Sequence, residues 1–99
     1  MVYIPQSIKR IIEASKSLIA PEKVILFGSR ARGDARKSSD YDILFYFDES
    51  KRKDWAKLQD KIEAEKLCLL PVDLVASFDC CEKLKQIAEK EGITLYERQ

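Results

Sequence analysis

The sequence of 99 residues contains no histidine. Without histidine the chain cannot by itself form a Ser-His-Asp or Cys-His nucleophilic site, and a zinc site with histidine ligands is equally excluded. Its three cysteines are odd in number and lack a paired CxxC spacing, so the sequence predicts neither a disulfide framework nor a zinc knuckle. Any chemistry must therefore use carboxylates, hydroxyls, thiols and cationic side chains.

An excess of charge of one sign is also absent, because 18 basic and 17 acidic side chains give a formal net charge of +1. No overall field attracts the chain to nucleic acid or to an anionic membrane, and direct nucleic-acid binding is not expected. No apolar run approaches the roughly 20 residues of a membrane-spanning helix, and the N-terminus lacks the pattern of a secretory signal. We expect a cytoplasmic protein without a membrane partner.

Glycine and proline are scarce, with three residues of each, while 45% of the residues are hydrophobic and 35% are charged. This composition excludes collagen-like, low-complexity and disordered classes. A chain of this length buries roughly 65% of its extended surface, which supports one hydrophobic core. We therefore predict a single domain over residues 1–99.

The apolar residues follow a helical period in some segments and form short runs typical of strands in others. Helices are predicted at residues 8–19, 51–66 and 81–91. A further short helix is predicted to begin with Ser29 as its N-cap. In the last long helix we expect Leu84, Ile87 and Ala88 to face inward and Gly92 to end the helix.

Strands are predicted at residues 23–27, 40–47, 71–76 and 93–96. Helices and strands then alternate along the chain, which predicts an α+β fold with a mixed sheet flanked by helices in an α/β two-layer arrangement. The connection between the first two strands is short for a parallel crossover. We therefore expect these two strands to be antiparallel.

Two aspartates stand two residues apart at the start of the predicted strand 40–47. Asp40 and Asp42 therefore project to the same face, where their oxygens can share a hard cation. Mg²⁺ takes one or two protein carboxylates and completes its octahedron with phosphate oxygens and water. An isolated Asp-x-Asp is more often a turn residue and an outward strand position, so the interpretation depends on the features around it.

A strand-to-helix turn precedes these aspartates at Gly28-Ser29. Glycine lets the backbone approach a ligand, and amides at a helix N-terminus can hold phosphate oxygens together with the Ser29 hydroxyl. The segment that follows is locally basic, with Arg30, Arg32, Arg36 and Lys37. Such charges are usually a solvated face, but the neighbouring Gly-Ser pair favours phosphate binding.

An acidic residue also interrupts the predicted strand 71–76, where Asp73 lies in the apolar run Val-Asp-Leu-Val. A buried carboxylate is costly unless it is paired or bound to a metal, although an aspartate on a solvent-facing strand edge is common. If this strand neighbours the one that carries Asp40 and Asp42, three carboxylates can bind two metal ions. Asp73 could then accept a proton from an incoming hydroxyl.

The spacing of these residues resembles the signature of the polymerase β-like nucleotidyltransferase superfamily: Gly28-Ser29, ten intervening residues, Asp40-Tyr41-Asp42, and Asp73 in a later strand. The spaced motif Gly-Ser-x10-Asp-x-Asp arises by chance in about one in a thousand chains of this length. The segments FGSRARGD at 27–34 and SDYDIL at 39–44 more closely resemble the minimal nucleotidyltransferase (MNT) group. The order of elements matches that group over nearly the whole chain.

This resemblance implies the polymerase β-like nucleotidyltransferase fold and a role for each matching residue. Asp40 and Asp42 would bind magnesium, with two ions expected, and Asp73 would be a third metal ligand or the activator of the acceptor hydroxyl. Gly28 and Ser29 would hold the nucleoside triphosphate. Arg32 is assigned to its phosphates, with Arg30 or Lys37 as equal alternatives.

The reaction implied is transfer of AMP, or another nucleoside monophosphate, from ATP or another triphosphate to a hydroxyl. The domain is too small to carry a separate acceptor-binding domain, so a partner should supply the acceptor. In the MNT group the partner is usually a helical HEPN protein, often a toxin, and the resemblance therefore implies the antitoxin of a toxin–antitoxin pair in complex with its partner. Two alternatives are a non-catalytic subunit that neutralises a helical partner by contact and a nucleotidyltransferase for small molecules such as antibiotics.

Overall fold

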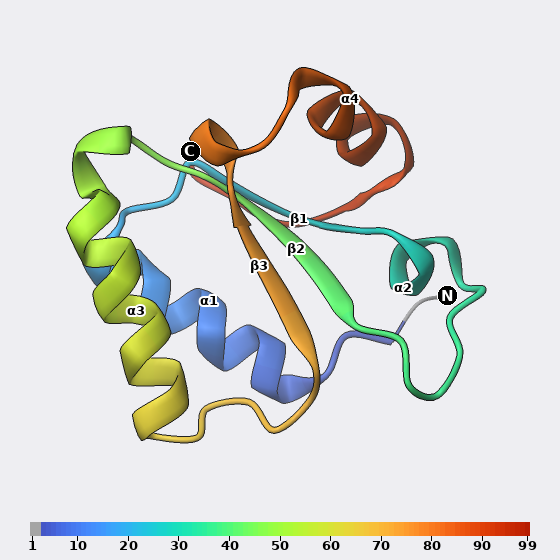
Figure 1. Ribbon diagram of the computed structural model, residues 1–99, viewed down its shortest axis with the longest axis horizontal. Helices are drawn as coiled ribbons and strands as arrows, with labels where there is room; N and C mark the ends of the chain where they lie inside the picture. Colours follow the sequence, from blue (N-terminus) through green and yellow to red (C-terminus); the bar gives the residue numbers. More distant parts are fainter. Residues whose placement is uncertain (1–2) are drawn as a thin grey trace.

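Helices and strands alternate through residues 3–99, the part of the chain that the computed structural model describes; residues 1 and 2 of the predicted domain lie outside it (Figure 1). The helices are α1 (Gln6–Leu18), α2 (Ser29–Arg32), α3 (Arg52–Ala64) and α4 (Glu82–Glu91), with short 3₁₀ turns η1 (Glu49–Lys51) and η2 (Ser77–Asp79). The strands are β1 (Lys23–Phe27), β2 (Tyr41–Tyr46), β3 (Val72–Ala76) and β4 (Ile93–Glu97). The predicted elements are thus confirmed, with ends that differ by one or two residues.

The four strands form one mixed sheet in the order β3-β2-β1-β4. Strand β1 is antiparallel to both β2 and β4, and β2 is parallel to β3. The antiparallel pairing of the first two strands confirms the prediction made from the short connection between them. The parallel crossover from β2 to β3 is made by α3, which is long enough to return the chain to the starting edge.

One face of the sheet is covered by α1 and α3 (Figure 1). The amphipathic spacing of α1 places Ile8 and Ile11 in this core, and α3 contributes Leu58, which is fully buried. The Trp55 ring of α3 packs on Phe45 of β2 at 5.3 Å between ring centroids. The side chains buried between these helices and the sheet form the larger apolar core, which contributes most of the hydrophobic stabilisation of the domain.

The opposite face carries α4 (Figure 1). Ala88 of this helix is fully buried against Ile25 and Leu44, and Leu84 is partly buried beside them, as predicted. The prediction for Ile87 is wrong, because its side chain is 39% exposed. The helix is short and amphipathic along a narrow stripe, so it buries only a few of its apolar side chains and covers part of the sheet.

Gly92 does follow the last helical residue, although it does not adopt the left-handed conformation of a common glycine cap. Its φ is −79°, and a β-carbon there would collide with the carbonyl oxygens of Ala88 and Leu26 and with the Ile25 side chain. Glycine is therefore required for the close approach of α4 to β1. In the described part of the chain, no helix combines the length and apolarity needed to cross a membrane.

Candidate functional site

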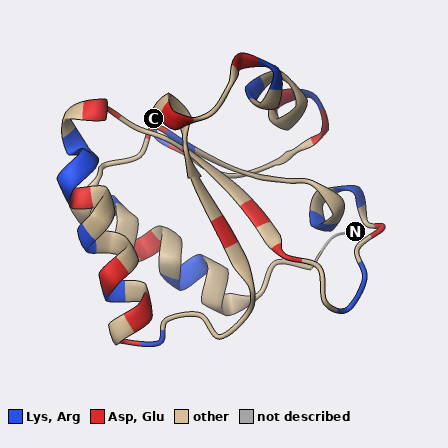
Figure 2. Ribbon diagram, viewed as in Figure 1, with Lys and Arg blue, Asp and Glu red and all other residues tan. Residues whose placement is uncertain are grey.

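The sheet brings together two aspartates that lie 31 positions apart in the sequence, Asp42 and Asp73. They are register partners on the parallel strands β2 and β3, so their side chains leave the same face of the sheet. Figure 2 shows the acidic segments of the two strands side by side. Since Asp42 also pairs with Phe27, the last residue of β1, the end of β1 meets the same place.

This face is the one that carries α4, because Leu44 and Ile25 follow Asp42 and Phe27 at the two-residue period of the strands. The helix covers the Ile25 and Leu44 positions and leaves the aspartate end open, since Asp73 is exposed and Asp42 is only partly buried. Asp40 lies one residue before β2 and is also exposed. The three predicted carboxylates therefore belong to one open end of the sheet.

Gly28 forms the turn between β1 and α2 directly beside Asp42. Its φ is +77°, and a β-carbon at this position would overlap the Oδ2 of Asp42. Glycine is required at this position for two reasons: other residues rarely adopt the positive φ, and the Asp42 carboxylate leaves no room for a β-carbon. The sequence predicted a close approach of the backbone to a ligand at Gly28, and the structure shows a different close neighbour, the carboxylate of Asp42.

The prediction that Ser29 is the N-cap of the short helix is wrong by one residue. Gly28 occupies the cap position, and its carbonyl accepts hydrogen bonds from the N–H groups of Ala31 and Arg32 at 3.1 Å each. Ser29 is the first helical residue, because the positive φ of Gly28 already turns the chain before it. Gly28 and Ser29 both remain at the end of β1, next to the carboxylates.

Negative charge accumulates at this end of the sheet. Partial burial raises the pKa of Asp42 above its ordinary value, and the charges of Asp73 and Asp40 raise it further. The charge of Arg32 lowers the pKa of Asp42, and this is a smaller effect. A cation bound here would relieve the repulsion among the carboxylates.

The donor set fits magnesium, because all three side chains offer hard carboxylate oxygens. Within residues 3–99, no three acidic, cysteine or histidine side chains approach closely enough to enclose a metal ion by themselves. Such an open arrangement fits Mg²⁺, which commonly takes one or two carboxylates and fills its other positions with phosphate oxygens and water. Asp42 and Asp73 are the pair placed to start such a site, with Asp40 beside them.

The basic residues after the turn separate into two groups. Arg32 is exposed, lies 3.3 Å from Asp34 and 3.8 Å from Glu91, and acts electrostatically on Asp42. Arg30 instead donates hydrogen bonds to main-chain carbonyls of the following loop. Between the two arginines this difference favours Arg32 as the side chain available to a phosphate, while Lys37, the other alternative left open by the sequence, is also exposed.

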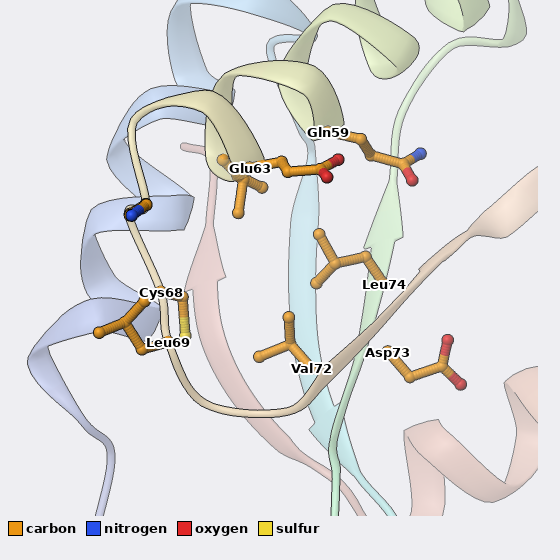
Figure 3. A pocket seen from close by; sticks show the side chains of 9 residues that line it. Gln59, Glu63, Cys68, Leu69, Val72, Asp73 and Leu74 are labelled. Carbon is orange, nitrogen blue, oxygen red and sulfur yellow. The ribbon is translucent and has the colours of Figure 1, made fainter.

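A pocket that the sequence did not predict lies beside the site, between the end of α3 and β3. Figure 3 shows Val72 and Leu74 pointing toward α3, while Asp73 points away from it. Leu69, in the loop before β3, is 84% exposed at this pocket. The apolar run at residues 67–70 was the available sequence signal. Asp73 is among the residues that line this pocket, whereas Asp40 and Asp42 are not, so the pocket adjoins the carboxylate site only at Asp73.

Comparison with known proteins gives consistent results. The family model described as polymerase beta, nucleotidyltransferase, matches residues 6–99. A curated relative from Methanocaldococcus jannaschii, named "Putative protein adenylyltransferase MJ1379", is 36% identical over 73 residues, which cover 69% of this chain and 73% of the relative.

Two solved structures have the same fold. A crystal structure of a toxin–antitoxin with AMP-PNP is 27% identical, covers 92% of this chain and 73% of its own, and has a TM-score of 0.66. A structure of a tri-AMPylated Shewanella oneidensis HEPN toxin in complex with its MNT antitoxin is 24% identical, covers 95% of this chain and 72% of its own, and has a TM-score of 0.61. At this identity, the second likeness concerns the fold alone.

Proposed function

The chain belongs to the polymerase beta nucleotidyltransferase family, and from this premise we propose that it transfers AMP from ATP to a hydroxyl group. The observation that carries the proposal is the register of Asp42 with Asp73 at the open end of the sheet, beside the turn at Gly28. This end offers the oxygen donors that a magnesium–nucleotide complex requires. The relative with AMP-PNP supports a triphosphate as the donor substrate.

In the proposed site Asp40, Asp42 and Asp73 hold Mg²⁺, with two ions expected. When bound, magnesium offsets the negative charge that develops on the phosphates during transfer. Gly28 and Ser29 lie against the triphosphate at the end of β1. Arg32 would exchange its surface partners for a phosphate oxygen, which a solvent-exposed ion pair permits at small cost.

In the proposed reaction the acceptor oxygen attacks the α-phosphorus of ATP. A bond forms between that oxygen and the α-phosphorus, and the bond from the α-phosphorus to the oxygen that bridges to the β-phosphorus breaks. Pyrophosphate leaves with the bond's electron pair, and the proton of the hydroxyl passes to the Asp73 carboxylate. Asp73 suits this role because it is exposed on the edge strand, where an acceptor can reach it.

The acceptor in this proposal is a hydroxyl on a helical partner of the HEPN type, with which the protein forms a complex and acts as the antitoxin. The relative solved as a toxin–antitoxin with AMP-PNP, at 27% identity, supports a toxin partner. The HEPN type of that partner is what the resemblance to the MNT group implies. We place the pair in the cytoplasm, since the three cysteines are free and a reducing compartment keeps them so.

The test is transfer of label from ATP labelled on the α-phosphate, in the presence of Mg²⁺ and the product of the neighbouring gene as the candidate partner. The proposal expects labelled partner with the wild type and loss of label with Asp42→Asn. Asp60→Asn is the matched control, because Asp60 is an exposed residue of α3 on the far face of the sheet. This control should label the partner as the wild type does.

Two results would contradict the proposal. An unlabelled but neutralised partner, in a tight complex with both the wild type and Asp42→Asn, would favour a binding subunit without catalysis. Label that appears on an aminoglycoside but not on the partner would favour a nucleotidyltransferase for small molecules.

A further inference from the structure

Arg30 connects the turn at Gly28 to the loop that leads into β2. Its Nε and Nη2 donate hydrogen bonds to the carbonyl oxygen of Ser39 at 3.2 and 3.1 Å, and Nη2 also donates to the carbonyl of Lys37 at 3.3 Å. The guanidinium carbon lies 4.4 Å from the centre of the Tyr41 ring. One side chain thus contacts the residues on both sides of Asp40.

These contacts restrict the backbone at Asp40. The Ser39 carbonyl belongs to the peptide unit that ends at the Asp40 nitrogen, and the buried Tyr41 ring begins β2. Two hydrogen bonds of 2.9 Å also close the loop. The Ser39 N–H donates to the Arg36 carbonyl oxygen, and the Arg36 N–H donates to the Ser39 Oγ. Arg30 therefore attaches an already closed turn to α2, whose N-cap Gly28 lies against Asp42.

We infer that Arg30 is a positioning residue that orients Asp40 and Asp42 for a divalent cation. The inference rests on the proposed function only in taking these carboxylates as the metal ligands. Arg30 touches neither carboxylate through its hydrogen bonds, and it acts through the Ser39 carbonyl and the Tyr41 ring. A planar guanidinium is suited to this task, because it can stack on a ring while its N–H groups reach two carbonyls.

Charge and position predict opposite effects when Arg30 is removed. If its positive charge were all that mattered, Arg30→Gln would strengthen cation binding by removing a repulsive charge near the metal. If Arg30 orients the ligands, the same substitution weakens cation binding. Groups that orient metal ligands typically change metal affinity by about 10–100-fold, so we expect a loss of roughly tenfold for this exposed site.

The experiment measures Mn²⁺ affinity, without nucleotide, from the electron paramagnetic resonance signal of free Mn²⁺. The variants are Arg30→Gln and Arg30→Lys, and the lysine variant keeps the charge but cannot both stack and reach two carbonyls. The matched control is Arg52→Lys. Arg52 also stacks on a ring, with its guanidinium carbon 4.7 Å from the centre of Phe78, and it pairs with Asp79 at 3.2 Å. These contacts do not involve the aspartates of the proposed metal site.

Weaker Mn²⁺ binding by both Arg30 variants, with Arg52→Lys like the wild type and all three proteins folded by circular dichroism, supports the inference. Unchanged or stronger binding by Arg30→Gln would overturn it, as would a loss of equal size in Arg52→Lys or a wild type that does not bind Mn²⁺. Absence of AMP transfer by the wild type, with the expected ranking of Mn²⁺ affinities, would overturn the proposed reaction and leave the positioning role supported.

Discussion

The repulsion between Asp42 and Asp73 predicts that a substitution expected to abolish AMP transfer should stabilise the metal-free fold. Replacing Asp42 by asparagine keeps the side-chain volume and removes one of two like charges that face each other across adjacent strands. Strands lie about 4.8 Å apart, and two charges at about 5 Å in a largely solvated setting repel by about 0.8 kcal/mol. Partial burial and the charge of Asp40 add to the cost of the charged form.

We therefore expect Asp42→Asn to raise the free energy of unfolding of the metal-free protein by about 1 kcal/mol at pH 7. For a domain of this size that corresponds to a rise in Tm of about 4–8 °C. The assay is thermal unfolding followed by circular dichroism in buffer with a chelator. Asp60→Asn is the control and should change stability by less than about 0.5 kcal/mol.

Magnesium should reverse the order of stability of Asp42→Asn and the wild type. A ligand present at ten times its Kd stabilises the folded state by about 1.4 kcal/mol, and only the wild type retains the full set of carboxylates. The difference between variant and wild type should therefore disappear or change sign as Mg²⁺ is added. A lower Tm for metal-free Asp42→Asn, or equal stabilisation of both proteins by Mg²⁺, would refute the reasoning.

The pH dependence follows from the direction of the pKa shift. Because the pKa of Asp42 is raised in the folded state, the ionised form carries a penalty that is fully present above the folded-state pKa. The penalty is lost as the pH falls below the ordinary value of about 4. The stability advantage of Asp42→Asn over the wild type should accordingly be largest at neutral pH and shrink toward pH 4.

Four further substitutions test the backbone and the core. Gly28→Ala should lower Tm and abolish AMP transfer, because it combines a positive φ with overlap on Asp42, whereas Gly33→Ala has a φ of +85° but open space and should cost only about 1 kcal/mol while transfer persists. Gly92→Ala should destabilise by about 1–3 kcal/mol in urea unfolding, since a β-carbon there meets backbone atoms; a neutral result would contradict the close approach of α4. Leu58→Ala should cost about 2–5 kcal/mol through the cavity left in the larger apolar core, and a loss below 1 kcal/mol would show that this core is loosely packed.

Sequence periodicity was sufficient for most elements of this fold. The β1 strand was predicted at its observed bounds from a short apolar run that stops at Gly28, and the structure shows these four apolar residues buried and the glycine at a positive φ. The inward position of Ile87 was wrong, because a helical period shows which residues share a stripe but not how far the sheet extends beneath it. The α4 helix lies over only part of its face, and that is a property of packing.

The candidate site divides in the same way. Sequence spacing was sufficient to nominate Asp40 and Asp42, because residues two apart on the predicted strand would share a face. In the structure β2 begins at Tyr41, so Asp42 lies on the strand and Asp40 directly precedes it. Asp73 could be nominated but not placed, because its distance from Asp42 depends on a parallel pairing across 31 positions. That pairing is non-local, and local residue patterns do not specify strand order.

The sequence by itself determined the chemistry available to this protein: carboxylates without histidine, a glycine-led turn, and a basic segment beside it. Only the tertiary structure decided how these groups are placed relative to one another. It set Asp42 against Asp73, left that end of the sheet open beside α4, and separated Arg30, whose hydrogen bonds hold the loop, from Arg32, whose charge acts on Asp42. Arg30 and Arg32 are the same residue type, two positions apart on the four-residue helix α2, and the sequence alone does not separate their roles. The difference between them is the direction in which the turn of the helix orients each side chain.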